Sequence, residues 1–584
     1  MKKNLSIVIL LISLAISQSV FSQTYSFEKG KVPEGWKIDK GVLHISSEKY
    51  KSGSRSLQIK WKQNAVLTIP SPTGISEACR NRNGGMNAWI YNESPTKENL
   101  LFSFRDETGK EVCQLPFLLD FKGWRCIWAK FQGDMNMSSK SNIQSVEIQF
   151  PQHTKKGVTY IDLLEFTSKV SWQNMSDAQY KVNRTDYSLI PDFIGYRNAT
   201  PKVEKVITAE DNQITTITDR LTTWYLGSGQ HSSERWIKMR TENEKTFIRN
   251  GVKAAQKIKI QYTEDHTPQG EPLFPMGAPT IIDGQEAKKF RSINENILLP
   301  LALDYRKNQN DQSLKKALYI YDWFNDQGWA DGSSMGTLCF EKLRSSGYFH
   351  SFFLLKEQLS PEQLKRELQT MNWFTMFGAC YQLPSHAGEV ADNLRALAIP
   401  KLIYALSQND KQEREVALTA FKHYMDNALG IAPGFFGTFK ADFSGYHHRG
   451  PYHSAYYPHA LYAGALIAYL LHDTPYALSE TTLHNLKQGL LTFRFFCAGL
   501  EVPAGTVGRF PKGQQILETL LPAFAYTALS FKEPDKELTA AFKRILESTE
   551  NQQAITEYIS NVNSNLAYTS TVGEIELVIQ LASS

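Results

Sequence analysis

The sequence is poor in cysteine for a chain of 584 residues. It has six cysteines, no CxxC motif, and only one pair of near neighbours, Cys113 and Cys126. This pattern favours buried thiols over a disulfide between that pair, and it excludes a disulfide framework and a thiolate metal cluster.

Long apolar runs are missing after the N-terminus, where none reaches the ~18 residues that a membrane span needs. Residues 1–22 combine two lysines, an apolar stretch from Leu5 to Ile16, and small or neutral residues before Gln23. These features predict a signal peptide that is cleaved near Ser22. The sequence therefore predicts a secreted or periplasmic protein with no membrane span.

Blocks of basic residues are also missing, although the formal net charge is +5. Without a lysine- or arginine-rich arm, nucleic acid is not expected as a partner. A mild positive charge is compatible with an acidic polymer. The sequence is rich in aromatic residues, with 11 Trp and 26 Tyr, and flat rings with a polar edge suit stacking on sugars, although most are expected in cores.

Two domains are indicated by a change in hydrophobic period. Residues 23–168 contain short alternating runs such as SLQIKW, SVEIQF and GVTYIDLL, separated by Gly, Asn, Pro and Asp. This pattern predicts a β-sandwich. Residues 169–230 are mixed and polar and are predicted to be a linker.

Residues 231–584 follow the period of helices. SPEQLKRELQTM begins with Ser360 as an N-cap, Pro361 at the first helical position and Gln363 to complete a capping box. EREVALTAFKHYMDNAL and ETTLHNLKQGLLTF have similar apolar faces. We expect an array of paired antiparallel helices.

The segment YHHRGPYHSAYYPH, residues 446–459, contains four histidines and four tyrosines. Gly450, Pro451 and Pro458 predict a loop there. Adjacent histidines without nearby acidic residues are a poor set of zinc ligands. The segment also has no GxSxG motif, which would indicate a nucleophilic serine. An acid/base site fits better, because histidine, tyrosine and arginine together can move a proton and stabilise an anion.

Three segments carry a resemblance to a known family. YHHRGPYHSAYYPHALYAGALIAYLLHDTP, AGTVGRFP and WFNDQGWADGSSMGT resemble parts of the chondroitin sulfate ABC lyases of polysaccharide lyase family 8. The resemblance implies a jelly-roll, lectin-like β-sandwich followed by an incomplete α/α toroid of antiparallel helix pairs. It also implies β-elimination at C5 of a uronic acid, with chondroitin sulfate, dermatan sulfate and hyaluronan as candidate polymers and no cofactor for catalysis.

The same resemblance implies roles for individual residues. His448 is expected to accept a proton or to assist the substrate carboxylate, with His447 as the second choice. Tyr456 is expected to be the general acid and base, ahead of Tyr457 and Tyr452. Arg509 is expected to hold the substrate or to support the tyrosine.

Further residues are expected to bind substrate or a structural ion. Asn393 matches an asparagine that bonds the uronate carboxylate in related lyases. The other predicted substrate contacts are His447, Arg449, Tyr452 and Trp329. Trp323 and Trp373 are further stacking candidates, and each of these three tryptophans is expected in the core rather than against the substrate. Glu28 and Asp162 lie where jelly-roll carbohydrate modules often hold a structural calcium ion.

One departure from the family pattern leaves alternatives open. Family members continue into β-sandwich domains that supply a glutamate, whereas this sequence stops at Ser584 and has only Glu574 and Glu576 near its end. The alternatives are a truncated gene product, a catalytically impaired truncated homologue that binds glycans, or a fragment that needs a second chain to supply the missing domains. A hydrolase would need paired carboxylates, and only Asp442 is near the loop.

Overall fold

A computed structural model of the chain describes twelve ranges of residues. These are 24–170, 176–181, 190–262, 268–270, 290–334, 345–454, 456–499, 501–508, 514–515, 520–547, 556 and 571–583. The predicted signal peptide and its cleavage site at Ser22 lie outside them.

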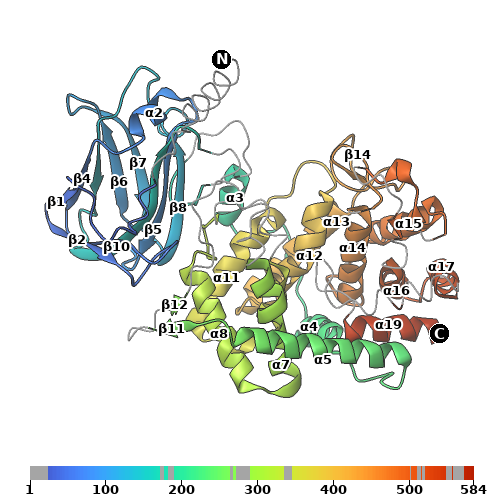
Figure 1. Cartoon of the computed structure of the whole chain (residues 1–584). Helices are drawn as coiled ribbons and strands as arrows, with labels where there is room; N and C mark the ends of the chain where they lie inside the picture. Colours follow the sequence, from blue (N-terminus) through green and yellow to red (C-terminus); the bar gives the residue numbers. More distant parts are fainter. Residues whose placement is uncertain are drawn as a thin grey trace, which may run out of the picture.

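Residues 24–170 form a sandwich of two five-stranded antiparallel sheets (Figure 1). The first sheet has the order β1 (Lys37–Ile38), β4 (Val66–Pro70), β9 (Ser145–Gln149), β6 (Asn99–Arg105) and β7 (Glu111–Leu118). The second has the order β2 (Gly41–Ser46), β3 (Ser56–Lys62), β10 (Lys156–Thr167), β5 (Gly85–Asn92) and β8 (Gly123–Lys130). A short helix, α2 (Ile75–Arg80), connects β4 to β5.

The second sheet is buried on both faces. Along β5, Ala88 and Ile90 point into the sandwich core, whereas Trp89 and Tyr91 belong to the core of the helical domain. β8 repeats this alternation, so that Trp124 packs against the helical domain. Since successive strand residues point to opposite faces, one sheet supplies both a core and a domain interface.

Buried polar contacts cross this interface. Asp326 pairs with the Lys49 ammonium at 3.2 Å and accepts a hydrogen bond from Tyr91 at 2.5 Å. Lys51 Nζ donates to the carbonyl of Gln327 at 2.9 Å and lies 4.2 Å from the centre of the Trp89 ring. The sandwich is therefore fixed to the helical domain by an interface that is both aromatic and charged.

The helical domain contains fourteen α-helices within the described ranges. They are α3 (Ile190–Arg197), α4 (Asp211–Leu226), α5 (Arg235–Ala255), α7 (Leu299–Asn308), α8 (Asp311–Asp326), α10 (Ser346–Leu355), α11 (Pro361–Thr375), α12 (Ala391–Leu406), α13 (Lys411–Ala428), α14 (Tyr457–Leu471), α15 (Glu480–Phe496), α16 (Leu521–Leu529), α17 (Lys536–Glu547) and α19 (Val572–Ser583). They pack in a ring that runs from α5 through α7, α10, α12, α14 and α16 to α19, which packs against α4 and α5 (Figure 1).

Two glutamates of α19 fix this helix in the ring. Glu574 is fully buried and accepts hydrogen bonds from Tyr462 and, at 2.7 Å, from Tyr526. Glu576 accepts the N–H groups of Ser228 at 2.7 Å and Gly229 at 3.1 Å. Both carboxylates are thus used in packing.

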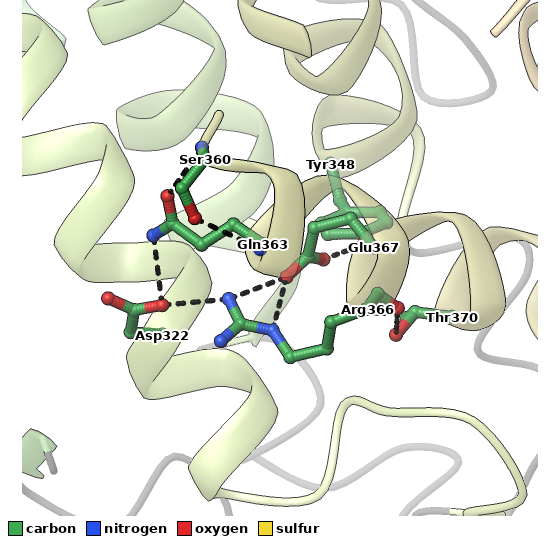
Figure 2. Close-up of polar contacts among 7 residues, drawn as sticks. All are labelled: Asp322, Tyr348, Ser360, Gln363, Arg366, Glu367 and Thr370. Atoms are coloured by element: carbon green, nitrogen blue, oxygen red, sulfur yellow. Dashed lines mark hydrogen bonds and ion pairs between the residues drawn. The ribbon is translucent and has the colours of Figure 1, made fainter. Parts of the chain in front are cut away.

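A second polar network joins α8, α10 and α11 (Figure 2). Arg366 pairs with Asp322 at 2.7 Å and with the buried Glu367 at 2.9 Å, and Tyr348 donates to Glu367 at 2.5 Å. The predicted capping box also lies here, since the Ser360 side chain accepts from the N–H of Gln363.

The structure confirms the predicted fold class, a β-sandwich before an α/α toroid. The predicted linker 169–230 needs correction, because α3 and α4 lie within it and α4 packs in the helical ring. Cys113 and Cys126 are free, buried thiols on different sheets, which excludes the alternative of a disulfide between them. No helix in the described ranges is long and apolar enough to cross a membrane.

Candidate active site

The histidine- and tyrosine-rich segment 446–459 begins with a tight hairpin, which precedes α14. β13 (Tyr446–His447) pairs with β14 (Gly450–Pro451), and the two residues between them, His448 and Arg449, have φ angles of 50° and 69°. Positive φ at both central positions is typical of a type I′ turn, which favours Asn and Gly. A residue with a side chain is disfavoured there by roughly 1–2 kcal/mol, so the hairpin holds two side chains in a strained, exposed turn.

The rings behind this turn form a compact stack. The His447 ring lies parallel to that of Tyr456, with centroids 3.8 Å apart and planes at 16°. His448 meets His447 at 4.1 Å with an interplanar angle of 69°, and Tyr452 meets Tyr456 edge-on at 4.7 Å. Tyr452 and Tyr456 are 4% and 6% exposed, so the exposed His448 is the outermost of the four rings.

The N-terminal turns of α12 supply charge to this stack. Arg395 pairs with Asp392 at 2.6 Å, and its guanidinium carbon lies 5.0 Å from the centre of the Tyr456 ring. The other oxygen of Asp392 lies 3.6 Å from Nε2 of His447. One carboxylate thus links the arginine above the tyrosine to the imidazole stacked on it.

Asn393 lies on the same turns of α12. Its side-chain nitrogen donates to Glu389 at 3.1 Å, and Glu389 also accepts from Tyr424 at 3.0 Å. The asparagine is thereby fixed by a partner that is itself held in place.

Three other groups of the segment are packed into the protein. Tyr457 is fully buried, its hydroxyl donates to the carbonyl of Phe443 at 2.7 Å, and burial raises its pKa. Burial lowers the pKa of His453 to about 4 and that of His459 to about 3, and the positive charge of Arg395 adds to the shift at His459. These groups support the stack from within. The segment is also not a loop to its end, because α14 begins at Tyr457, with Pro458 in its first turn.

The structure brings together His447, His448, Arg449, Tyr452 and Tyr456 on the hairpin, with Asn393 on α12. Asp392 and Arg395 were not predicted as site residues. Their spacing of three along a helix, beside Asn393, is the signal in the sequence that indicates one helical face.

One predicted site residue, Trp329, does not join the stack. Trp329 is 1% exposed and lies flat on Phe374, with centroids 3.5 Å apart, so its assignment as a substrate contact is wrong and the expectation that it lies in the core is confirmed. Trp323 and Trp373 are also buried. Arg509 lies outside the described residues.

Glu28 and Asp162 already have partners in the sandwich. Glu28 accepts the N–H groups of Ser54 and Arg55, both at 2.9 Å, and Asp162 accepts those of Lys51 and Ser52 at 2.7 and 3.1 Å. Burial raises the pKa of Asp162 to about 7. No group of three or more His, Cys, Asp or Glu side chains that could hold a metal occurs among the described residues, and the calcium site stays a prediction.

Comparison with family models gives two matches that cover most of the chain. The model described as "Lyase, catalytic" matches residues 200–552, and the model described as "Lyase, N terminal" matches residues 21–182.

The chain is also similar to curated enzymes. It is 26% identical over 587 residues to a chondroitin sulfate ABC exolyase of Bacteroides thetaiotaomicron, covering 92% of the chain and 54% of that protein. It is 24% identical over 582 residues to a chondroitin sulfate ABC endolyase of Proteus vulgaris, covering 91% and 55%. The chain therefore spans about half the length of these relatives.

Solved structures show a more distant likeness. A xanthan lyase of Paenibacillus aligns with a TM-score of 0.48 and 13% identity, over 64% of this chain and 34% of that one. A chondroitin AC lyase of Streptomyces coelicolor A3, in complex with chondroitin sulphate, aligns with a TM-score of 0.47 and 11% identity, over 64% and 49%.

Proposed function

The chain belongs to the lyase family that includes the chondroitin sulfate ABC lyases, and from this premise we propose that it is a glycosaminoglycan lyase. The proposed substrates are chondroitin sulfate and dermatan sulfate, with hyaluronan as a third polymer to be tested. The observation that carries the proposal is the stack of His447 and Tyr456 beneath the exposed turn of His448, with Arg395 at the tyrosine ring.

The proposed reaction is a β-elimination at the uronic acid. A base removes the proton from C5, and the electron pair of that C–H bond forms the double bond between C4 and C5. The bond from C4 to the bridging oxygen breaks, and this oxygen leaves with its electron pair and receives a proton. No water is consumed, and the product carries an unsaturated uronate.

In this reaction we assign the proton transfers to Tyr456. The tyrosine oxygen can take up the C5 proton when it is ionised and can return a proton to the leaving oxygen. The guanidinium of Arg395 lies 5.0 Å from the ring centre and is paired with Asp392, so it is held in a fixed position beside the ring. The stacked imidazole of His447 holds the ring in one orientation, which is what a general base needs in order to meet a single carbon–hydrogen bond.

We assign His448, Arg449 and Asn393 to the substrate carboxylate. A C5 proton becomes acidic only when the negative charge that develops on the carboxylate is stabilised. The exposed turn offers an imidazole and a guanidinium, and Asn393 offers an amide. Asp392 and Arg395 are positioning residues that act through His447 and Tyr456. Arg509 remains the predicted further arginine.

The proposed place of action is outside the cytoplasm. The lysines, apolar stretch and small residues of positions 1–22 support export. Large anionic polymers do not cross a membrane freely, so an enzyme for them acts where the polymer is found. The second chain predicted as a partner is likewise a proposal.

The test follows ultraviolet absorbance of the unsaturated uronate while the purified chain is incubated with chondroitin sulfate, dermatan sulfate or hyaluronan. We expect absorbance to rise with the wild type and the rate to fall by about 10²–10⁴ in His448→Ala and Tyr456→Phe, the range for loss of a general acid or base. Tyr457→Phe is the matched control, because it removes a hydroxyl that only bonds a backbone carbonyl. A folded wild type that gives no absorbance with any polymer would contradict the proposal.

A further inference from the structure

The two halves of the candidate site lie on separate elements. One half is the first turns of α12, with Asp392, Asn393 and Arg395, and the other is the hairpin with the rings stacked behind it. Between these halves, Asp392 lies 3.6 Å from His447, and Arg395 lies 5.0 Å from the centre of the Tyr456 ring. Both distances are longer than a hydrogen bond, so neither contact by itself fixes how the halves lie.

A path of three hydrogen bonds also joins the halves. The side-chain nitrogen of Asn393 donates to the carboxylate of Glu389 at 3.1 Å. The main-chain carbonyl of Glu389 accepts from the hydroxyl of Thr438 at 2.7 Å, and the carbonyl of Thr438 accepts from the N–H of Tyr446 at 2.9 Å. Tyr446 is the first residue of the hairpin and precedes His447. Thr438 is therefore the residue at which the path crosses from one half to the other.

Two glycines allow the two segments to approach closely enough for the bond from Thr438. Gly388 has a φ angle of 99° and Gly437 one of 60°, in the region that favours glycine. A Cβ atom at Gly437 would lie 2.9 Å from the Cα atom of Gly388, and one at Gly388 would lie 2.5 Å from the Cβ atom of Ala432. The close packing beside Thr438 therefore requires both glycines.

The residues on either side of the crossing are held by partners of their own. The N–H of Glu389 donates to the carbonyl of the last residue of α13 at 3.1 Å, and its carboxylate accepts from the buried Tyr424 at 3.0 Å. On the other side, Phe439 pairs with Gly445 as in an antiparallel sheet. Thr438 is completely buried, so water does not compete with its bond to Glu389.

We propose that Thr438 is a positioning residue that sets the separation between Asn393 and the rings of the hairpin. This inference rests on the proposed function, in which Asn393 binds the substrate carboxylate while Tyr456 moves the proton. The carboxylate is attached to C5 itself, so the amide and the tyrosine must be held at a separation that matches one sugar. An error of about 1 Å in such a placement can lower a rate about a hundredfold.

The test compares Thr438→Val, which removes the hydroxyl and keeps the branched shape, with Thr438→Ser, which keeps the hydroxyl. Thr370→Val is the matched control, because Thr370 on α11 is equally buried and its hydroxyl donates to the carbonyl of Arg366 at 3.0 Å. In Thr438→Val we expect kcat on chondroitin sulfate to fall about tenfold to a hundredfold, with KM little changed. We expect Thr438→Ser and Thr370→Val to keep a kcat close to that of the wild type. The Tm of each variant is measured, so that a loss of kcat is separated from unfolding.

A double variant separates positioning from general damage. In an Asn393→Ala background the placement of the amide no longer matters, so we expect Thr438→Val to lower kcat by a smaller factor there than in the wild type. Equal factors in the two backgrounds would overturn the inference. Equal kcat values for Thr438→Val and Thr438→Ser would overturn it as well.

Hydrogen exchange tests the link without cleavage. We expect the amides of residues 446–452 to exchange faster in Thr438→Val than in the wild type and in Thr438→Ser, because the hairpin opens more often once its tie to α12 is lost. A wild type that cleaves no polymer would refute the proposed function, and the exchange rates would still decide this inference. Faster exchange in Thr438→Val alone supports Thr438 as the link between the halves, and unchanged exchange overturns it.

Discussion

The charged network of α8, α10 and α11 gives a sharp prediction for Arg366→Met. Arg366 is the counter-ion of Glu367, which is 1% exposed, and it also pairs with Asp322 (Figure 2). Methionine keeps much of the apolar stem and removes the charge. Asp322 retains a hydrogen bond from Gln363 at 3.1 Å, so the loss falls mainly on Glu367.

The expected loss is about 3–5 kcal/mol in the free energy of unfolding, the range for a buried carboxylate that loses its partner. Burial already raises the pKa of Glu367, and Arg366 opposes that shift. In the variant the pKa rises further. A carboxyl group with a raised folded-state pKa favours folding while it is protonated, and this contribution is lost as pH rises through that pKa. The variant is therefore least stable relative to the wild type at neutral pH, and it recovers as pH falls.

Urea unfolding of the full chain, followed by tryptophan fluorescence and circular dichroism at neutral and mildly acidic pH, measures both effects. Arg366→Met/Glu367→Gln is the control, because it removes the unpaired charge and leaves the Tyr348 hydroxyl a partner. We expect it to regain most of the lost stability at neutral pH. Equal free energies of unfolding for Arg366→Met and Arg366→Met/Glu367→Gln at neutral pH would refute the reasoning. A loss of stability in Arg366→Met that is the same at both pH values would also refute it.

Two further predictions concern the site and the domain interface. Asp392→Asn removes the charge that pairs with Arg395 and faces His447, so we expect kcat to fall by about tenfold to a hundredfold with KM and Tm little changed; an unchanged kcat would exclude the positioning role. Burial lowers the pKa of Lys51 to about 7 from 10.5, so between these pH values the unfolded chain binds a proton that the folded chain does not, and wild-type stability rises with pH. The stability of Lys51→Met relative to the wild type is therefore expected to be greater at pH 7 than at about pH 9.5, and urea midpoints that differ equally at both pH values would contradict this.

The two domains could be predicted because strand and helix periods depend on residues that are neighbours in sequence. Alternation with a period of two predicted the sandwich, and the capping box of Ser360 and Gln363 predicted the start of α11. The signal for α4 was also present in the predicted linker, since Ile214, Ile217 and Leu221 recur at helical spacing and are buried. The polar residues between these three apolar residues made the segment resemble a linker, so the helix was not predicted.

The candidate site was only partly predictable, because its two halves come from separate elements. The hairpin residues lie together in sequence, so their clustering pointed to them. Asp392 and Arg395 precede the hairpin by a full helix pair, and only packing brings them to His447 and Tyr456. Trp329 shows the opposite failure, because a tryptophan beside polar residues has the same local pattern whether it meets a sugar or, as here, Phe374.

The use of aromatic residues in the two domains decides where a sugar can bind. Trp89, Tyr91 and Trp124 on the outer face of the second sheet would suit a carbohydrate, but they are buried against the helical domain together with Asp326. A sugar could reach them only if the charged interface opened. In the assembled protein this face holds the domains together, and the exposed phenylalanine rings of the described residues, Phe435, Phe436 and Phe495, lie on the helical domain. That face of the sandwich is therefore covered in the assembled protein, where it supports the helical domain.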